Sequence, residues 1–191
     1  AAMINYSATF AVGFLASLYL QVVMELDARS AGWVMLSQPM LMAIFSPFAG
    51  RLSDRMEPRI VASVGMALTT VGLFLFIFIS KDSSLPMVIT DLSIMGLGFA
   101  FFSSPNNNAI MGAVGKEKYG VAASSLATMR MSGQAVSMSI VALIMAWHGG
   151  QAVLGANSVP MVLDSIHYAL MVFTVLSTIG IFFSLKRGRV R

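Results

Sequence analysis

Long stretches without a charged residue divide this sequence. The segments 1–24, 30–50, 60–80 and 165–185 contain no Asp, Glu, Lys or Arg, and the shortest of them is 21 residues long. A helix needs about 20 apolar residues to cross the hydrocarbon core of a bilayer. Only 10% of all residues are charged, whereas a soluble domain has about 25%. These windows therefore predict an integral membrane protein and exclude an ordinary soluble one.

Two longer windows complete the predicted topology. Residues 83–115 contain Asp91 as their one charge, and residues 119–163 contain Arg130 and no other. Each window has room for one span, so we expect an all-α protein that forms a single bundle of six transmembrane helices. The predicted spans cover about 4–24, 31–50, 60–80, 86–112, 119–147 and 165–185.

The basic residues are unequally divided between the two sets of loops. Two cations, Arg29 and Lys81, fall on one side of the predicted membrane. Lys and Arg are enriched in cytoplasmic loops, so the richer side is expected to face the cytoplasm. We therefore expect a multi-pass protein of the cell membrane with both termini inside. The cations on the richer side are Arg51, Arg55, Arg59, Lys116, Lys118, Lys186, Arg187, Arg189 and Arg191.

The composition also makes metal, cofactor and enzyme chemistry unexpected. The chain has no Cys and two His, so we expect no metal site and no cofactor, and we expect no nucleic-acid partner. A membrane-embedded enzyme such as an intramembrane serine protease is a weak alternative. None of the 16 glycines is followed by a serine two residues later. The chain is therefore not expected to be an enzyme.

Two charged residues inside the spans are the first candidates for transport or gating. A charge at the centre of a spanning helix costs about 2.5–3.5 kcal/mol on insertion scales. Asp91, five residues after Pro86, is either a proton-binding site or a shallow carboxylate favoured by the helix dipole. Arg130 is either an anion or gating contact, or a structural partner for carbonyls and amides of a neighbouring helix. In both cases it should face protein or water.

Amide side chains inside the spans form the second group of candidates. The run Ser103-Ser104-Pro105-Asn106-Asn107-Asn108 contains a proline, which kinks a helix. Its three amides either line a cavity or lie buried in protein, or they mark the cytoplasmic end of the helix. Pro39 and Pro47 predict that the second span is bent and polar-lined, and Gly96 and Gly98 predict close helix approach. The candidate amides are Gln38, Asn106, Asn107, Asn108 and Gln134.

A charged motif follows the second span. Its sequence is Gly50-Arg51-Leu52-Ser53-Asp54-Arg55-Met56-Glu57-Pro58-Arg59. It resembles the Gly-x-Leu-x-Asp-Arg-x-Gly-Arg-Arg motif of the major facilitator superfamily, which Gly50, Asp54, Arg55 and Arg59 match and from which Glu57 and Pro58 depart. We interpret it as a cytoplasmic latch in which Asp54 pairs with Arg55, Arg59 or a helix N-terminus. The alternative is a simple positive-inside signal.

A second resemblance covers nearly the whole chain. Pro105-Asn106, Lys116 to Ser125 and Arg130-x-x-Gly133-Gln134 are similar to the C-terminal half of fourteen-span drug:proton antiporters of that superfamily. The resemblance implies one bundle built as a 3+3 inverted repeat, with the first, second, fourth and fifth helices lining a central cavity. It also implies that the chain is half of a longer transporter.

The resemblance leads to an expected function. We expect proton-coupled efflux of drugs or small amphiphiles by alternating access, with the proton as coupling ion. The expected partners are the lipid bilayer, the amphiphilic substrate, and the N-terminal six-helix half or a second copy of this chain. The alternative is a six-span fragment with no transport of its own, or a structural protein that dimerises.

Overall fold

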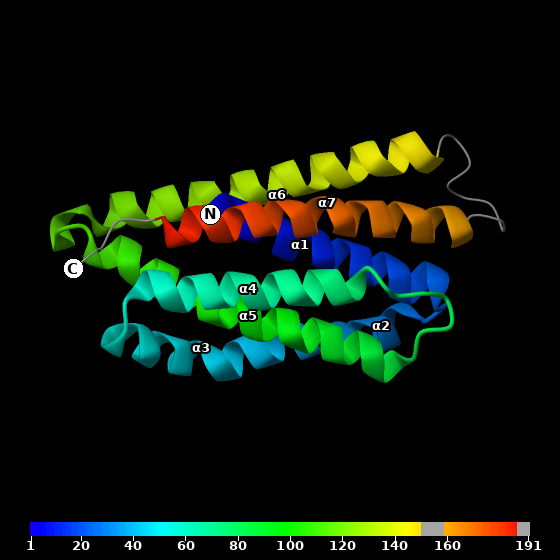
Figure 1. The fold of residues 1–191 in the computed structure, drawn as a ribbon, viewed down its shortest axis with the longest axis horizontal. Helices are drawn as coiled ribbons and strands as arrows, with labels where there is room; N and C mark the ends of the chain where they lie inside the picture. Colours follow the sequence, from blue (N-terminus) through cyan, green and yellow to red (C-terminus); the bar gives the residue numbers. More distant parts are fainter. Residues whose placement is uncertain (150–158, 187–191) are drawn as a thin grey trace.

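The computed structural model describes residues 1–149 and 159–186, and this part of the chain contains helices and no strands (Figure 1). Two short helical turns accompany the α-helices: a π-helical turn, Tyr19–Val23, extends the first helix, and a 3-10 turn, Lys116–Lys118, precedes the sixth. The α-helices are α1 Ala2–Leu18, α2 Ala28–Met35, α3 Ser37–Arg55, α4 Pro58–Phe76, α5 Leu85–Gly112, α6 Tyr119–Gly149 and α7 Val159–Leu185.

Six of the described helical segments are long and apolar enough to cross a membrane, because α2 and α3 together form one segment, Ala28–Arg55. The predicted bend in this second span is present. The helix is interrupted at Leu36, and Pro39, in the first turn of α3, has no N–H to bond the Met35 carbonyl. Pro47, in contrast, lies inside α3 without ending it.

The helix ends differ from the predicted spans mainly at the polar margins. The helix α3 continues to Arg55, five residues past the predicted end at 50, and α7 begins at Val159 instead of 165. Conversely, α4 ends at Phe76, and residues 77–84 form turns before α5. Charge-free windows mark the stretch that crosses hydrocarbon, whereas a helix can extend beyond it into the headgroup region.

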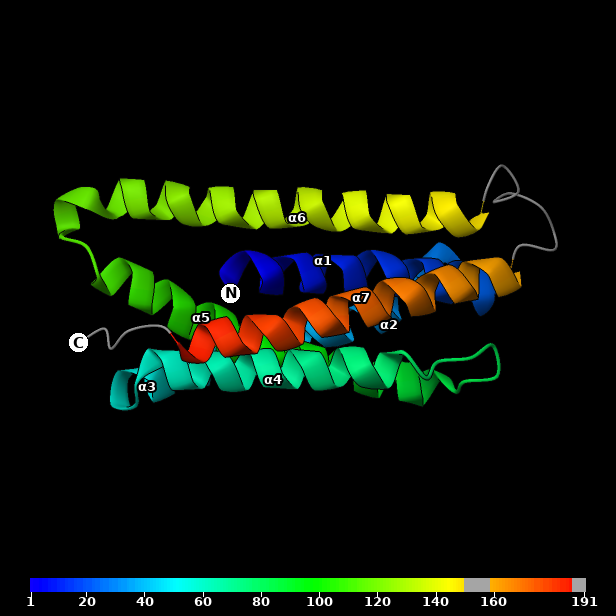
Figure 2. The ribbon, with the colours of Figure 1, turned by 45° about the horizontal axis from the view of Figure 1, so that its top comes forward.

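The helices pack in a reciprocal pattern, visible in Figures 1 and 2. α3 packs on α5, and α6 packs on α1. Each of these pairs joins the second helix of one triplet to the first helix of the other. The third helices, α4 and α7, pack on each other. This reciprocal packing is the arrangement expected when two three-helix repeats are related by a two-fold axis.

Glycines bring α4 and α5 into backbone contact. A Cβ on Gly98 would lie 2.6 Å from the backbone N of Thr69, and a Cβ on Gly65 would lie 2.7 Å from the carbonyl oxygen of Gly98. Neither position has room for a methyl group. The predicted role of Gly98 in close approach is thus confirmed, and Gly96 has the same role against α3, where a Cβ would overlap the Gln38 carbonyl.

Hydroxyl pairs join α4 to α7. The Ser63 hydroxyl donates to Ser184 Oγ at 2.8 Å, and the Thr70 and Ser177 hydroxyls share a hydrogen bond of 2.8 Å. Seven residues separate the two positions on each helix. Such bonds contribute about 0.6 kcal/mol each in membrane proteins, so they add modestly to a contact that is otherwise apolar.

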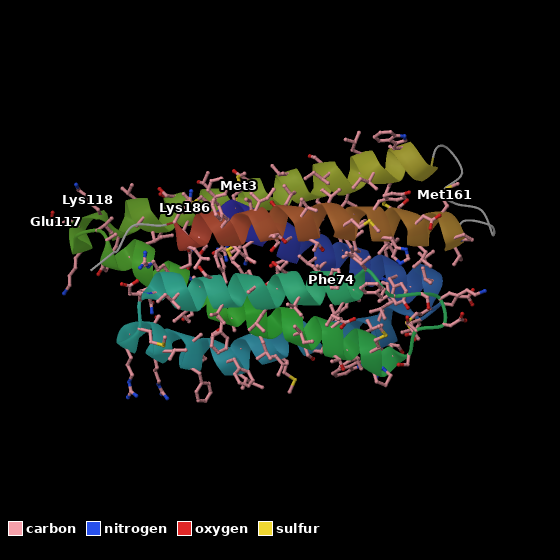
Figure 3. The ribbon with its side chains drawn as sticks, in the orientation of Figure 1. Met3, Phe74, Glu117, Lys118, Met161 and Lys186 are labelled. Atoms are coloured by element: carbon pink, nitrogen blue, oxygen red, sulfur yellow. The ribbon has the colours of Figure 1, made fainter. Side chains whose placement is uncertain are left out.

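The described cations of the richer side gather at one end of the bundle. Lys118, before α6, and Lys186, after α7, lie at the same end in Figure 3, which is also the end where α3 connects to α4. This grouping is the one on which the predicted orientation depends. Arg187, Arg189 and Arg191 lie outside the described residues.

Candidate functional site

A groove of about 620 Å³ lies along one side of the bundle. It draws its walls from α1, from α2 and α3, from α5 and from α6, which are the first, second, fourth and fifth spans that the sequence resemblance implied. The volume is in the range of small-molecule sites, which are about 300–1,000 Å³. The lining residues are Tyr6, Thr9, Phe10, Gly13, Phe14, Ser17, Met35, Gln38, Pro39, Met42, Phe99, Arg130, Gln134 and Met138.

Three residues singled out in the sequence meet in this groove: Gln38 from α3, and Arg130 and Gln134 from α6. Gln38 is more than 90 residues from the other two in the chain, and only helix packing brings them to one surface. Arg130 is exposed to the groove, and within the described residues its guanidinium makes neither an ion pair nor a hydrogen bond. The interpretation of Arg130 as a partner for helix carbonyls or amides is therefore not supported in this bundle.

Tyr6 is a groove residue that the sequence analysis missed. Its hydroxyl lies within electrostatic range of the Ser103 and Asn106 side chains and of the Arg130 guanidinium. Its ring makes edge-to-face contacts with Phe99 and Phe102, with ring centroids 5.9 and 6.0 Å apart. A tyrosine in a charge-free window carries no distinguishing signal, because tyrosines are also frequent at membrane interfaces.

The helix packing holds the polar groove residues in place. Ser7 Oγ donates to the carbonyl oxygen of Gly133 at 2.7 Å, which fixes α6 against α1 one residue before Gln134. A Cβ on Gly133 would lie 2.8 Å from the carbonyl oxygen of Met3, so α6 approaches α1 closely here. Gly96 likewise lets α5 approach the backbone of Gln38 on α3 closely. The resemblance motif Arg130-x-x-Gly133-Gln134 therefore combines a packing glycine with two groove side chains.

The three asparagines of α5 lie outside the groove lining. The helix continues through Pro105 to Gly112, so they do not mark its end either. Asn106 is fully buried beneath Tyr6, whereas Asn108 is exposed and its Nδ2 donates to Ser53 Oγ of α3 at 3.2 Å. Asn107 is half-buried. Asn108 thus connects α5 to α3, and Asn106 lies near Tyr6 of α1.

Asp91 is buried in the second turn of α5, away from the groove. Its side chain is 3% exposed, and its Oδ2 atom has no hydrogen-bond partner in the described part of the chain. Leu92 and Met95, which follow it on the helix, belong to the main apolar core. The interpretation as a shallow carboxylate at the membrane surface is therefore disfavoured, because such a group would be hydrated.

The latch motif is mostly helical and not a loop. Gly50 to Arg55 form the last turns of α3, and Pro58 begins α4, as its fixed φ favours. Arg59 forms an ion pair with Glu57, the residue that departs from the family pattern. Asp54 is exposed and has no ion pair among the described residues, so the predicted pairing of Asp54 with Arg55 or Arg59 is wrong in this conformation.

Comparisons with known proteins extend these observations. The sequence profile described as Major Facilitator Superfamily matches residues 1–187. The riboflavin transporter RibZ of Clostridioides difficile is 37% identical over 125 residues, which are 65% of this chain and 27% of that protein. The lincomycin resistance protein LmrB of Listeria monocytogenes is 27% identical over 142 residues, or 74% of this chain and 30% of that protein.

A third relative has a similar extent of match. The multidrug resistance protein Stp of Mycobacterium tuberculosis is 26% identical over 141 residues, which are 74% of this chain and 26% of that protein. In each case the match covers less than a third of the relative's own length.

Proposed function

Because this chain belongs to the Major Facilitator Superfamily, we propose that it is one six-helix half of a secondary transporter and that its groove is one wall of the substrate cavity. The observation that carries the proposal is the meeting of Gln38, Arg130 and Gln134 in one groove of about 620 Å³. Polar groups inside spanning helices are costly and typically mark substrate pathways. The rest of the cavity belongs to the partner half, which is the N-terminal half of the same transporter.

The substrate that suits such a groove is a small amphiphile. Phe10, Phe14 and Phe99 offer ring surfaces, and Met35, Met42 and Met138 offer flexible apolar contacts that adapt to differently shaped ligands. Relatives named for resistance to lincomycin and to multiple drugs favour export as the direction of transport. We therefore place this chain in an exporter of drugs or similar amphiphiles.

Asp91 is the proposed proton-binding residue of this half. It is a buried carboxylate in an apolar environment, so it is stable there in the neutral form and can take up a proton in one conformation and release it in another. It lies outside the groove, so protonation would act by changing how α5 packs on α4. Uptake of a proton at Asp91 and release of substrate from the groove are then linked through α5, which contributes Phe99 to the groove wall.

The grouped cations support a proposed orientation of the chain in the membrane. We propose that the end carrying Lys118 and Lys186 faces the cytoplasm of the cell, so that both chain ends are inside. Cysteine labelling from either side of the membrane tests this. Lys118→Cys should react only with reagent added inside, and Lys81→Cys only with reagent added outside. Reversed labelling would contradict the orientation.

The test of transport uses the full-length protein in proteoliposomes. With an imposed pH gradient, accumulation of a fluorescent amphiphile should exceed that of protein-free vesicles and should collapse when the gradient is dissipated. Asp91→Asn should remove the dependence on the gradient, while Asp82→Asn, which changes an exposed acid between α4 and α5, should not. Absence of protein-dependent movement for every amphiphile tested would refute the proposal. The same assay with residues 1–191 expressed alone tests whether this segment is active by itself or as a dimer.

A further inference from the structure

The groove carries one charge, and it is positive. Among its lining residues Arg130 is the one ionised side chain, and no acidic residue lines it. None of the eight acidic residues, all of which lie in the described segments, belongs to the groove lining: Asp91 on α5, for example, is buried in the apolar core, and Glu57 pairs with Arg59. Within the described segments of this half, no carboxylate neutralises the Arg130 guanidinium.

An isolated guanidinium beside apolar walls is unfavourable unless an anion accompanies it. Arg130 shares the groove lining with aromatic rings and thioethers, beside which the effective dielectric constant is below that of water and a counter-charge is worth more. Arginine also offers a planar fork of donors that matches a carboxylate, sulfonate or phosphate in two parallel hydrogen bonds. The Gln134 amide, one helical turn further along the same face of α6, supplies a further donor.

The one charged side chain of the groove lies near one end of its length. On α1 the lining runs from Tyr6 to Ser17, which is about 16 Å at 1.5 Å per residue. Arg130 lies near Tyr6 at one end, because Ser7, the neighbour of Tyr6, donates to the carbonyl oxygen of Gly133, three residues after Arg130. Phe10 and Phe14 follow one and two turns further on. A ligand that fits this order has an acidic group at one end and a flat aromatic body at the other.

We propose that the groove selects aromatic amphiphiles bearing one acidic group, with the acid held by Arg130 and the rings lying on Phe10 and Phe14. This inference rests on the proposed function, since it assumes that the groove is the substrate site. It goes further by assigning the sign of the substrate's charge and the direction in which the substrate lies. The acidic group would point to the end where the described cations gather, so those cations would also draw anions toward the groove.

The experiment compares two probes with the same aromatic skeleton. 8-Anilinonaphthalene-1-sulfonate carries one sulfonate, and N-phenyl-1-naphthylamine lacks it. Binding to the full-length transporter in phosphatidylcholine nanodiscs is followed by fluorescence, with empty nanodiscs subtracted. The wild-type protein should bind the sulfonate about tenfold or more tightly than the neutral probe, as expected for hydrogen bonds to charged groups. Arg130→Gln should bring this ratio close to one, and Arg130→Lys should preserve most of it.

Matched variants separate the possible failures. Arg29→Gln removes an exposed cation outside the groove and should leave the ratio unchanged. Gly13→Leu fills the groove and should weaken both probes. Equal affinity of the two wild-type probes, or a ratio unchanged by Arg130→Gln, would overturn the acidic-substrate inference, while loss of neutral-probe binding in Gly13→Leu would still support the groove as the site. If neither probe binds in a way that Gly13→Leu affects, both the inference and the substrate role of the groove fail.

Discussion

Gly98 on α5 and Gly13 on α1 both occupy the interior of spanning helices, but their surroundings are opposite. A Cβ on Gly98 would meet the Thr69 backbone at 2.6 Å, whereas a Cβ on Gly13 would meet nothing within 4 Å. The first glycine joins two helices, and the second leaves the groove open. The same residue type therefore serves packing where α4 meets its neighbours α5 and α7, which we call the closed side, and space at the groove, which we call the open side. The bundle is asymmetric, with one side closed by helix packing and the other open at the groove.

The largest expected effect comes from giving both glycines the same side chain. Gly98→Ala should destabilise the bundle by about 3 kcal/mol, because the methyl group meets backbone atoms that cannot move aside. Gly13→Ala should stabilise α1 slightly, since alanine loses less backbone entropy in a helix. Thermal unfolding of the full-length protein in detergent measures both. Equal melting temperatures for the two variants would mean that the two sides do not differ as described.

The next effect is on transport and not on folding. Gly13→Leu should lower transport of an amphiphile about tenfold or more, because the new side chain occupies part of the groove of about 620 Å³. The folded fraction should not change, since the leucine meets no existing neighbour at its Cβ.

The matched control for this substitution is Gly32→Leu. A Cβ on Gly32, in α2, would also meet no atom within 4 Å, but this glycine lies outside the groove lining. Its replacement should leave transport unchanged. A similar loss of transport in both variants would show that leucine acts through the helix and not through the groove.

The contrast between the two sides also explains which features the sequence could predict. The six spans follow from hydropathy alone, because each spanning helix must satisfy its backbone internally and the required length is set by the membrane. Gly96 and Gly98 are identifiable as packing residues because small side chains in spans typically mark close helix approach. By the same criterion Gly13 would have been assigned to packing, which is incorrect. The spacing of glycines does not reveal whether a neighbouring helix is present.

The candidate site was predictable to a smaller extent. Gln38, Arg130 and Gln134 stand out because polar groups in spans are rare, and all three line the groove. Tyr6 could not be selected, since its role depends on the contact of α1 with Ser103 and Asn106. Arg59 was one of three alternative partners predicted for Asp54, with Arg55 and a helix N-terminus, but Glu57 lies closer to Arg59 in sequence and forms the ion pair with it. Pairing of this kind is decided by local geometry at the end of a helix.

A smaller effect is expected where the closed side relies on hydroxyl groups. Thr70 on α4 and Ser177 on α7 are 2.8 Å apart, and both Thr70→Val and Ser177→Ala remove this bond with little change in shape. A double-mutant cycle should give a coupling energy of about 0.6 kcal/mol, the average for such bonds in membrane proteins. Denaturation of the four proteins in mixed micelles measures it. A coupling energy above about 2 kcal/mol, more than twice the value of a buried methylene, would mean that hydroxyls and not backbone approach hold the closed side together.

The smallest effect concerns Asp27, which caps α2 on the open side. The Ser30 side chain, together with the backbone N–H groups of Ser30 and Arg29 that donate to the Asp27 carboxylate, holds the pKa of Asp27 below the usual range. These bonds favour the ionised form in the folded state. The cap is therefore fully formed above the ordinary pKa of an aspartate and is lost as the pH falls through the lowered one. Hydrogen exchange of the first turn of α2 should accelerate below that pH relative to the intrinsic rate.

Two variants of Asp27 decide whether the carboxylate is the cause. Asp27→Asn keeps an N-cap acceptor but cannot titrate, so exchange in the first turn of α2 should lose its dependence on acid while staying slow. Asp27→Ala should be fast at every pH. Because α2 is a short helix on the open side of the bundle and Asp27 is exposed, neither variant should change the melting temperature of the whole protein measurably. A lower melting temperature of the whole protein in Asp27→Ala would show that α2 contributes to the stability of the closed side. The two sides would then not be independent in stability.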